Sequence, residues 1–218
     1  MKIINRSLFV LLILVLPVIC ILAAANLTFR LPDVYRYEFS RSEVTKEIGL
    51  DLSQDELADF FSAYMFGDGD FQKTAWYMGR ERPVFGRGEG TVMGQFRNLL
   101  NLSARVLAAA FLLALFSFWF LLRQDKKEAL RIAWRAASVL YAACIVALFA
   151  LFSFEELHTQ LYEWYFVYSF DEADILPLLL SRAFFLENAV VVTVLSLIIL
   201  AVGYSVTKRL TRPDRMFY

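Results

Sequence analysis

The sequence predicts an all-α membrane protein: a four-transmembrane-helix bundle with a small mixed cap between the first and second spans. Composition is the first observation, because 59% of the 218 residues are hydrophobic, whereas soluble domains have roughly 45–50%. The second is a set of four apolar runs, each about as long as a helix needs to cross a hydrocarbon core. They lie at about 7–25, 104–122, 135–154 and 188–206. We therefore treat 1–218 as a single membrane domain.

The first apolar run, 7–25, follows Lys2 and Arg6 and has two interpretations. A retained membrane anchor is one of them. A cleaved signal peptide is the other, since Ala23–Ala25 offers the small residues of a cleavage site. We favour the anchor, because the run is long for a signal peptide.

Basic residues predict how the chain is oriented in the membrane. The N-terminus, the loop 123–135 and the tail after residue 207 are rich in Lys and Arg and contain few acids. Because such segments stay on the cytoplasmic side, we expect both termini to be cytoplasmic. The cap, 26–100, and the outer loop, 155–187, are then extracytoplasmic, in a multi-pass protein of the cell membrane.

The cap contains signals for one helix and one hairpin. Ser53–Glu56 forms a capping-box pattern, apolar residues follow at helical spacing, and Gly67 stands where the helix would end. Phe71–Met78 and Pro83–Phe85 could pair as a hairpin around Gly79–Arg82. We expect the helix of the second span to begin near Thr91.

Composition argues against several classes of partner. The net charge is zero, so nothing points to nucleic acid. Cys20 and Cys144 both lie inside apolar runs, which disfavours a disulfide framework or a zinc site. The Asp68–Asp70 turn lacks the later ligands of a Ca²⁺ loop, and Gly86–Gly90 lacks the strand that precedes a phosphate loop. We expect neither a metal nor a cofactor.

The candidate catalytic group is His158, the only histidine in the chain, which follows the third span. If the helix continues past the span, Glu155, His158 and Tyr162 share one face. Histidine transfers protons in both directions near neutral pH, and a neighbouring glutamate would fix its tautomer. The alternative is an interfacial histidine that is merely bonded to a glutamate. No Gly-x-Ser-x-Gly motif supports a serine hydrolase.

Two stretches carry a resemblance to a known family. Phe85–Met93 (FGRGEGTVM) is similar to a Phe-x-x-x-Glu-x-x-His-Met stretch before the second span of that family. After His158, Asp174, Leu176 and the pair Phe184-Phe185 fall at the family's offsets from its histidine. The chain thus resembles the bacterial lipoprotein intramolecular transacylase (Lit-like) family of four-span integral membrane proteins.

The resemblance implies a reaction and a set of partners. Members move an acyl chain from the diacylglyceryl group of a lipoprotein to the amine of its N-terminal cysteine, which makes the lyso-form. The partners would be the diacylglyceryl-modified lipoprotein N-terminus and membrane lipids. By this resemblance His158 is the base and acid, and Arg87 or backbone N–H groups stabilise the oxyanion. The remaining supporting or substrate-binding candidates are Glu155, Tyr162, Met93, Asp174, Phe184 and Phe185.

The chain also departs from the family pattern. The family's histidine before the second span falls on Val92, which carries no proton. An expected tryptophan, aspartate and proline fall on Val167, Phe170 and Ser181. Two interpretations stay open: an enzyme that uses Glu89 in place of the missing histidine, and a non-catalytic relative that binds lipids or a partner.

Overall fold

The computed structural model describes residues 2–42, 52–77, 80–154, 156, 160, 165 and 174–212. It divides the chain into two compact units. The membrane unit consists of 1–25, 103–148 and 192–218, and the cap unit consists of 26–102 and 149–191. We describe each unit by itself.

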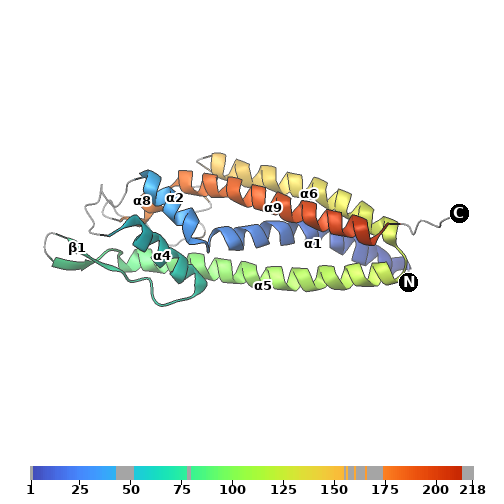
Figure 1. The fold of residues 1–218 in the computed structure, drawn as a ribbon, viewed down its shortest axis with the longest axis horizontal. Coiled ribbons are helices and arrows are strands. Elements are labelled where there is room, and N and C mark those ends of the chain that lie inside the picture. Colours follow the sequence, from blue (N-terminus) through green and yellow to red (C-terminus); the bar gives the residue numbers. More distant parts are fainter. Residues whose placement is uncertain are drawn as a thin grey trace. The chain divides into compact units, whose positions relative to one another are not determined.

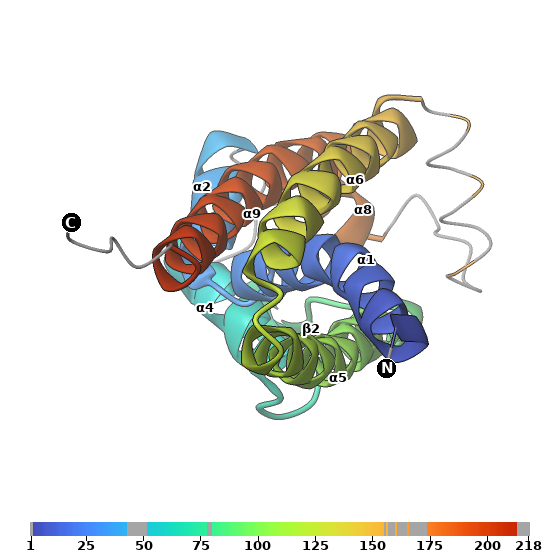
Figure 2. The ribbon, with the colours of Figure 1, turned by 90° about the vertical axis from the view of Figure 1, so that its right-hand side faces the viewer.

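Four long helices confirm the predicted four-span, all-α class. They are α1 (Lys2–Thr28), α5 (Arg87–Arg123), α6 (Lys127–Ser153) and α9 (Arg182–Leu210). Each contains an apolar stretch long enough to cross a membrane. Figures 1 and 2 show their membrane-unit segments side by side. The assignment of 1–218 to one membrane domain stays a prediction.

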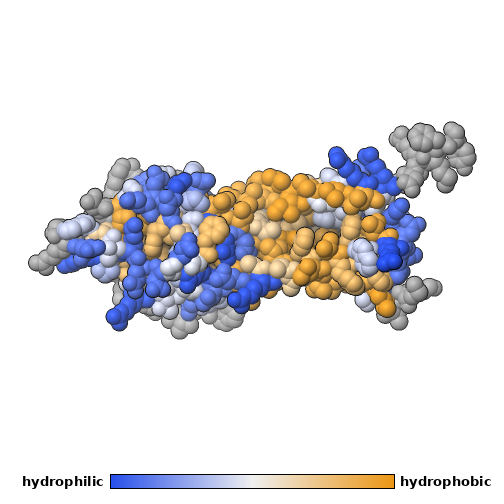
Figure 3. All heavy atoms as spheres, turned by 60° about the horizontal axis from the view of Figure 1, so that its bottom comes forward, coloured by the Kyte–Doolittle hydropathy of each residue, from blue (hydrophilic) through white to orange (hydrophobic). Residues whose placement is uncertain are grey.

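The membrane unit has a narrow core and an apolar exterior. All four helices contribute to one core, which includes Leu12 of α1, Leu121 of α5, Leu130 and Ala137 of α6, and Leu200 of α9. Other large apolar side chains point outward, and Figure 3 shows hydrophobic residues covering the visible face of this unit. Such a surface is stable in contact with lipid chains, whereas in water it would be costly.

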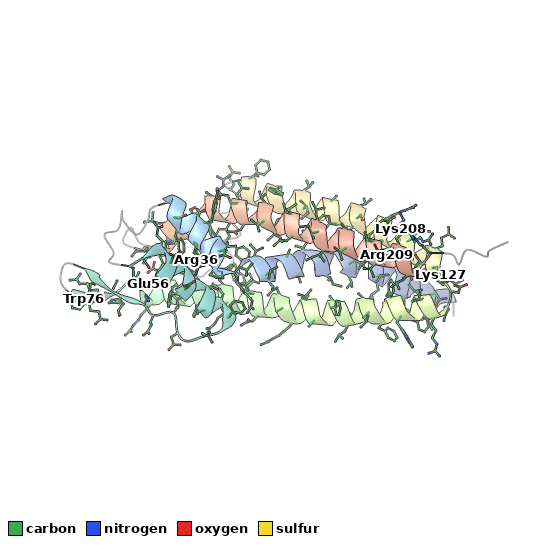
Figure 4. All side chains as sticks on the ribbon, viewed as in Figure 1. Arg36, Glu56, Trp76, Lys127, Lys208 and Arg209 are labelled. Atoms are coloured by element: carbon green, nitrogen blue, oxygen red, sulfur yellow. The ribbon has the colours of Figure 1, made fainter. Side chains whose placement is uncertain are left out.

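Polar contacts gather the chain ends at one end of the membrane unit. The Asn5 side-chain amide donates to Gln124 Oε1 at 2.8 Å, and Arg131 Nε donates to Thr211 Oγ1 at 2.9 Å. The start of α1, the α5–α6 turn and the end of α9 therefore lie together. Basic residues of α6 and α9 lie at this end, including Lys127 (Figure 4). Which side of the membrane this end faces stays a prediction.

Within its described residues, the cap unit contains three short helices and one hairpin: α2 (Pro32–Ser42), α4 (Gln54–Phe66), β1 (Thr74–Tyr77), β2 (Arg80–Pro83) and α8 (Leu176–Leu179). The predicted helix is confirmed as α4. Ser53 and Glu56 form the reciprocal capping box, and Gly67 ends the helix with φ 111°. Helix α2 was not predicted from the sequence.

Two predicted boundaries were wrong. The second strand is Arg80–Pro83 rather than Pro83–Phe85, because Tyr77 pairs with Arg80 and leaves a two-residue connection. Helix α5 begins at Arg87 rather than near Thr91. Its first turn is stabilised by Glu89, so the glycine-rich stretch is part of the helix.

Aromatic side chains form the core of the cap unit. Tyr35, Phe39 and Phe61 are fully buried, and the Phe71 and Phe85 rings lie 4.6 Å apart. Other aromatic residues, including Tyr37 and Trp76, are exposed. The aromatic residues that the structure describes in the outer segments thus include both a packed core and exposed surface residues.

Candidate functional site

One face of α5 carries three positions of the family motif, Glu89, Val92 and Met93, together with Phe96. Glu89, Val92, Met93 and Phe96 follow the i, i+3, i+4, i+7 spacing of a single helical face. All four are buried, with exposed fractions of 2%, 3%, 0% and 9%. Val92, the position of the family's histidine in our comparison of motifs, is therefore in the core of the cap unit.

Glu89 ties together two segments that are far apart in the chain. Its Oε2 accepts the Gly86 N–H at 2.6 Å, which caps the start of α5. Its Oε1 accepts the N–H groups of Ile175 and Leu176 at 2.8 and 2.7 Å. Both carboxylate oxygens are thus engaged, and these bonds hold the start of α8 against the start of α5.

Asp174 also approaches Gly86. A Cβ atom built on Gly86 would lie 3.6 Å from Glu89 Oε2 and 3.8 Å from Asp174 Oδ1. Two acidic side chains therefore converge on the residue that precedes α5. The partial positive charge of a helix N-terminus favours carboxylates at this place.

Phe184 and Phe185 belong to a cluster of four rings with Phe29 and Phe96. Centroid distances within the cluster run from 5.3 Å, for Phe184 and Phe185, to 6.5 Å, for Phe29 and Phe185. Phe184 is fully buried and Phe185 is half-buried. The cluster joins the end of α1 to α5 and α9.

Tyr35 packs on this cluster through a stacked contact with Phe184, with centroids 5.9 Å apart. Its hydroxyl donates to the Phe29 carbonyl at 2.8 Å. Burial raises the pKa of Tyr35 above its ordinary value, so the phenol stays protonated and keeps this bond.

Arg87 differs from its neighbours, since it is exposed on the first turn of α5. Its side chain makes no hydrogen bond or ion pair within the described residues. Five of the predicted site residues thus lie in the cap unit and take part in its network of contacts: Glu89, Met93, Asp174, Phe184 and Phe185. Arg87 is in the same unit with its guanidinium in solvent.

His158, Glu155 and Tyr162 lie outside the described residues. Between residues 155 and 173 of the same outer loop, Glu156, Gln160 and Tyr165 are described. The Tyr165 hydroxyl donates to the Gln95 carbonyl of α5 at 3.3 Å. The part of the chain that the structure describes contains no group of His, Cys, Asp and Glu arranged to hold a metal ion.

Sequence reasoning missed two features of this site, the contact of Tyr165 and the bonds from Glu89 to Ile175 and Leu176. A glutamate three residues after Gly86 is a signal for a capping bond within α5. Nothing comparable marks residues 175 and 176 as its partners, because the contact spans 86 residues of chain.

Comparison with known proteins identifies the family of the chain and supports its fold. The family model described as lipoprotein intramolecular transacylase Lit matches residues 10–185. The fold is similar to the in meso structure of the membrane integral lipoprotein intramolecular transacylase Lit from Bacillus cereus. That match has 18% identity and a TM-score of 0.76, and it covers 100% of both chains.

Two variants of the Bacillus cereus protein, with a histidine replaced by alanine or by arginine, match at 17% identity and a TM-score of 0.75. They cover 99% of this chain and 97% and 95% of theirs. No curated protein matches the sequence. Because the family model covers most of the chain, this membrane protein belongs to the Lit family of lipoprotein intramolecular transacylases.

Proposed function

We propose that the protein is a membrane acyltransferase that moves an acyl chain from the diacylglyceryl group of a lipoprotein to the amine of its N-terminal cysteine. Family membership over residues 10–185 is the observation that carries this proposal. The substrate is a diacylglyceryl-modified lipoprotein N-terminus held among membrane lipids. The product is the N-acylated lyso-form.

The reaction exchanges an ester for an amide. The amine nitrogen attacks the ester carbonyl, an amide C–N bond forms, and the ester C–O bond breaks. The proton that the amine loses reaches the leaving glyceryl oxygen, so one group can serve as base and then as acid. Donor and acceptor belong to one substrate molecule, and positioning therefore supplies much of the rate.

In this proposal His158 carries the proton, with Glu155 and Tyr162 beside it. Arg87 supports the proposal as an oxyanion donor, because its guanidinium is exposed and makes no ion pair within the described residues. Glu89 fits a positioning role better than proton transfer, since both of its oxygens already accept backbone N–H groups. Its contacts hold Asp174 and α8 beside α5.

We further propose that both termini are cytoplasmic and that the cap and His158 are extracytoplasmic. The support is the gathering of both chain ends and the α5–α6 turn at one end of the membrane unit. This end is rich in Lys and Arg, which favours the cytoplasmic side.

One observation favours a second candidate function, a non-catalytic family member that binds lipids or a partner. Val92 occupies the place of the family's histidine and is 3% exposed. A valine side chain carries no proton and cannot replace the imidazole in proton transfer. If two histidines are required for transfer, this chain lacks one of them.

Mass spectrometry of lipoprotein N-termini tests the proposal, in a host that makes only the diacylglyceryl form. We expect the N-acylated lyso-form with the wild-type protein and its absence with His158→Ala. Gln160→Ala is the matched control, because this neighbouring residue is exposed. It should retain the activity.

An unchanged diacylglyceryl form, in cells with well-folded wild-type protein, would eliminate the enzyme. In that case Val92→His separates the two explanations. A gain of lyso-form would show that only the histidine is missing, and continued inactivity would favour a binding protein.

A further inference from the structure

In the β1–β2 hairpin, residues whose backbone N–H and C=O groups point toward the partner strand alternate with residues whose groups point away from it. The Val84 N–H donates to the Lys73 carbonyl at 2.8 Å, which makes these two residues a hydrogen-bonded pair. Bonded and non-bonded pairs alternate along an antiparallel ladder. Thr74 with Pro83 and Trp76 with Glu81 are therefore the non-bonded pairs. Their N–H and C=O groups point away from the partner strand.

The two edges of the hairpin differ in what they offer to another strand. On the β2 edge, Pro83 has no N–H, and the strand Arg80–Pro83 is otherwise charged. Proline and charges are the usual protection of a sheet edge. On the β1 edge, Thr74 and Trp76 each present an N–H and a C=O. Neither is charged, and both are exposed.

No third strand pairs with β1 in the part of the chain that the structure describes. Trp76 is 59% exposed, and Figure 4 shows it on the hairpin. Among the residues that the structure describes, the β1 edge thus lacks the proline and the charges that protect the β2 edge.

The edge is also preformed. Ala75, on the opposite face of β1, is 5% exposed and packs into the cap core, and so do Val84 and Phe85. The Thr74 hydroxyl donates to Glu81 Oε1 at 2.6 Å across the two strands. A strand that docks here meets groups that are already in place, which lowers the entropic cost of binding.

We infer that the β1 edge binds the extended polypeptide that follows the lipidated cysteine of the substrate. This inference rests on the proposed function. Main-chain pairing to a sheet edge accepts almost any peptide sequence and needs only an extended backbone. Thr74 pairs with Pro83, and from Pro83 the chain reaches Gly86, where Glu89 and Asp174 converge, within three residues. The base of the β1 edge is therefore near the candidate site.

The same edge is too small to hold two copies of the chain together. Strand β1 has four residues, two of which face outward. A stable dimer buries about 1,200 Å² or more, far beyond the reach of such a strand. A short peptide that is also anchored by its lipid needs no more than this edge provides.

The test uses the full-length protein in phosphatidylcholine nanodiscs. The probe is a fluorescent octapeptide that begins with S-(dialkylglyceryl)cysteine, whose ether linkages prevent acyl transfer. The comparison ligand is the same lipidated cysteine without the peptide. We expect the octapeptide to bind about tenfold more tightly, which corresponds to one or two main-chain hydrogen bonds.

Thr74→Pro should abolish this advantage, because it removes an outward N–H from the β1 edge. Thr74→Val controls for loss of the hydroxyl, and Glu81→Pro removes the outward N–H of the opposite edge. Both controls lose the Thr74–Glu81 hydrogen bond but keep the outward N–H groups of β1, so both should retain most of the octapeptide's advantage. Equal loss with Glu81→Pro, or an octapeptide that binds no better than the cysteine, would overturn the inference.

A second measurement leaves the protein unaltered, in case Thr74→Pro fails to fold. N-methylation of alternate amides of the octapeptide should weaken binding for one of the two alternating sets only. Equal tolerance of both sets, or a peptide-independent dimer that Thr74→Pro disrupts, would refute the assignment. The ether probe cannot react, so this assay and the lyso-form assay fail independently.

Discussion

Replacement of Glu89 tests the central contact of the candidate site. In Glu89→Gln, the single amide oxygen can still accept from Ile175 and Leu176, but the NH₂ group then faces the Gly86 N–H. One hydrogen bond to a charged group is lost and a donor is left unsatisfied, at a cost of about 1.5–3 kcal/mol. Glu89→Ala removes all three bonds.

Glu89→Ala should lower the free energy of unfolding by less than the loss of three separate hydrogen bonds would suggest. Gly86 is exposed and Ile175 is half-buried, so water replaces part of what is lost. We expect Glu89→Ala to lower the free energy of unfolding by roughly 3–5 kcal/mol. The loss should be local, because the carboxylate connects the start of α8 to α5.

Hydrogen exchange measured by mass spectrometry, with thermal unfolding in detergent, provides the assay. Peptides that contain Ile175 and Leu176 should lose protection in Glu89→Gln and lose more in Glu89→Ala. Glu128→Gln is the control, since Glu128 also lies in the first turn of a helix but is exposed. Glu128→Gln should change neither the amide protection at residues 175 and 176 nor the unfolding temperature measurably.

Lyso-form production should fall in proportion to the lost protection if Glu89 positions the site. A different result would refute this reasoning: full loss of activity in Glu89→Gln while protection at residues 175 and 176 and the unfolding temperature stay unchanged. Glu89 would then be a proton carrier rather than a positioning residue.

Three further predictions concern packing, polar contacts and pH. A Cβ atom on Gly203 would lie 2.4 Å from the Trp134 ring, so Gly203→Ala should destabilise by about 1–2 kcal/mol in thermal unfolding despite the better helix propensity of alanine. Tyr141→Phe removes a hydroxyl that bonds to two oxygens of α9; it should cost about 0.6 kcal/mol in denaturant titration, and a cost above 3 kcal/mol would contradict this. The hydrogen bond from the Ser53 backbone N–H lowers the pKa of Glu56, and the bond from the Ser53 hydroxyl lowers it further. The stability that these bonds contribute is therefore complete above the ordinary glutamate pKa, and it is lost as the pH falls through the lowered pKa. Protection of the α4 amides, measured relative to the intrinsic exchange rate at each pH, should fall over that acidic range, and unchanged protection would refute the prediction.

Local signals were sufficient for much of the fold. The length of the apolar runs predicts the four spans, since only a helix satisfies its own backbone within lipid. The capping box and Gly67 predict α4 because both act within one turn of the helix end. Helix α2 could not be predicted from local signals. It is stabilised by the burial of Tyr35 and Phe39, which depends on residues from other segments of the chain.

Motifs also identified the family, together with five residues that take part in contacts of the cap unit: Glu89, Met93, Asp174, Phe184 and Phe185. Only the tertiary structure decided that Glu89 bonds to residues 175 and 176, that Val92 is buried, and that Gly203 makes room for Trp134. These contacts join segments that are distant in the chain. Their partners are selected by packing, which leaves no periodic or local trace in the amino-acid sequence.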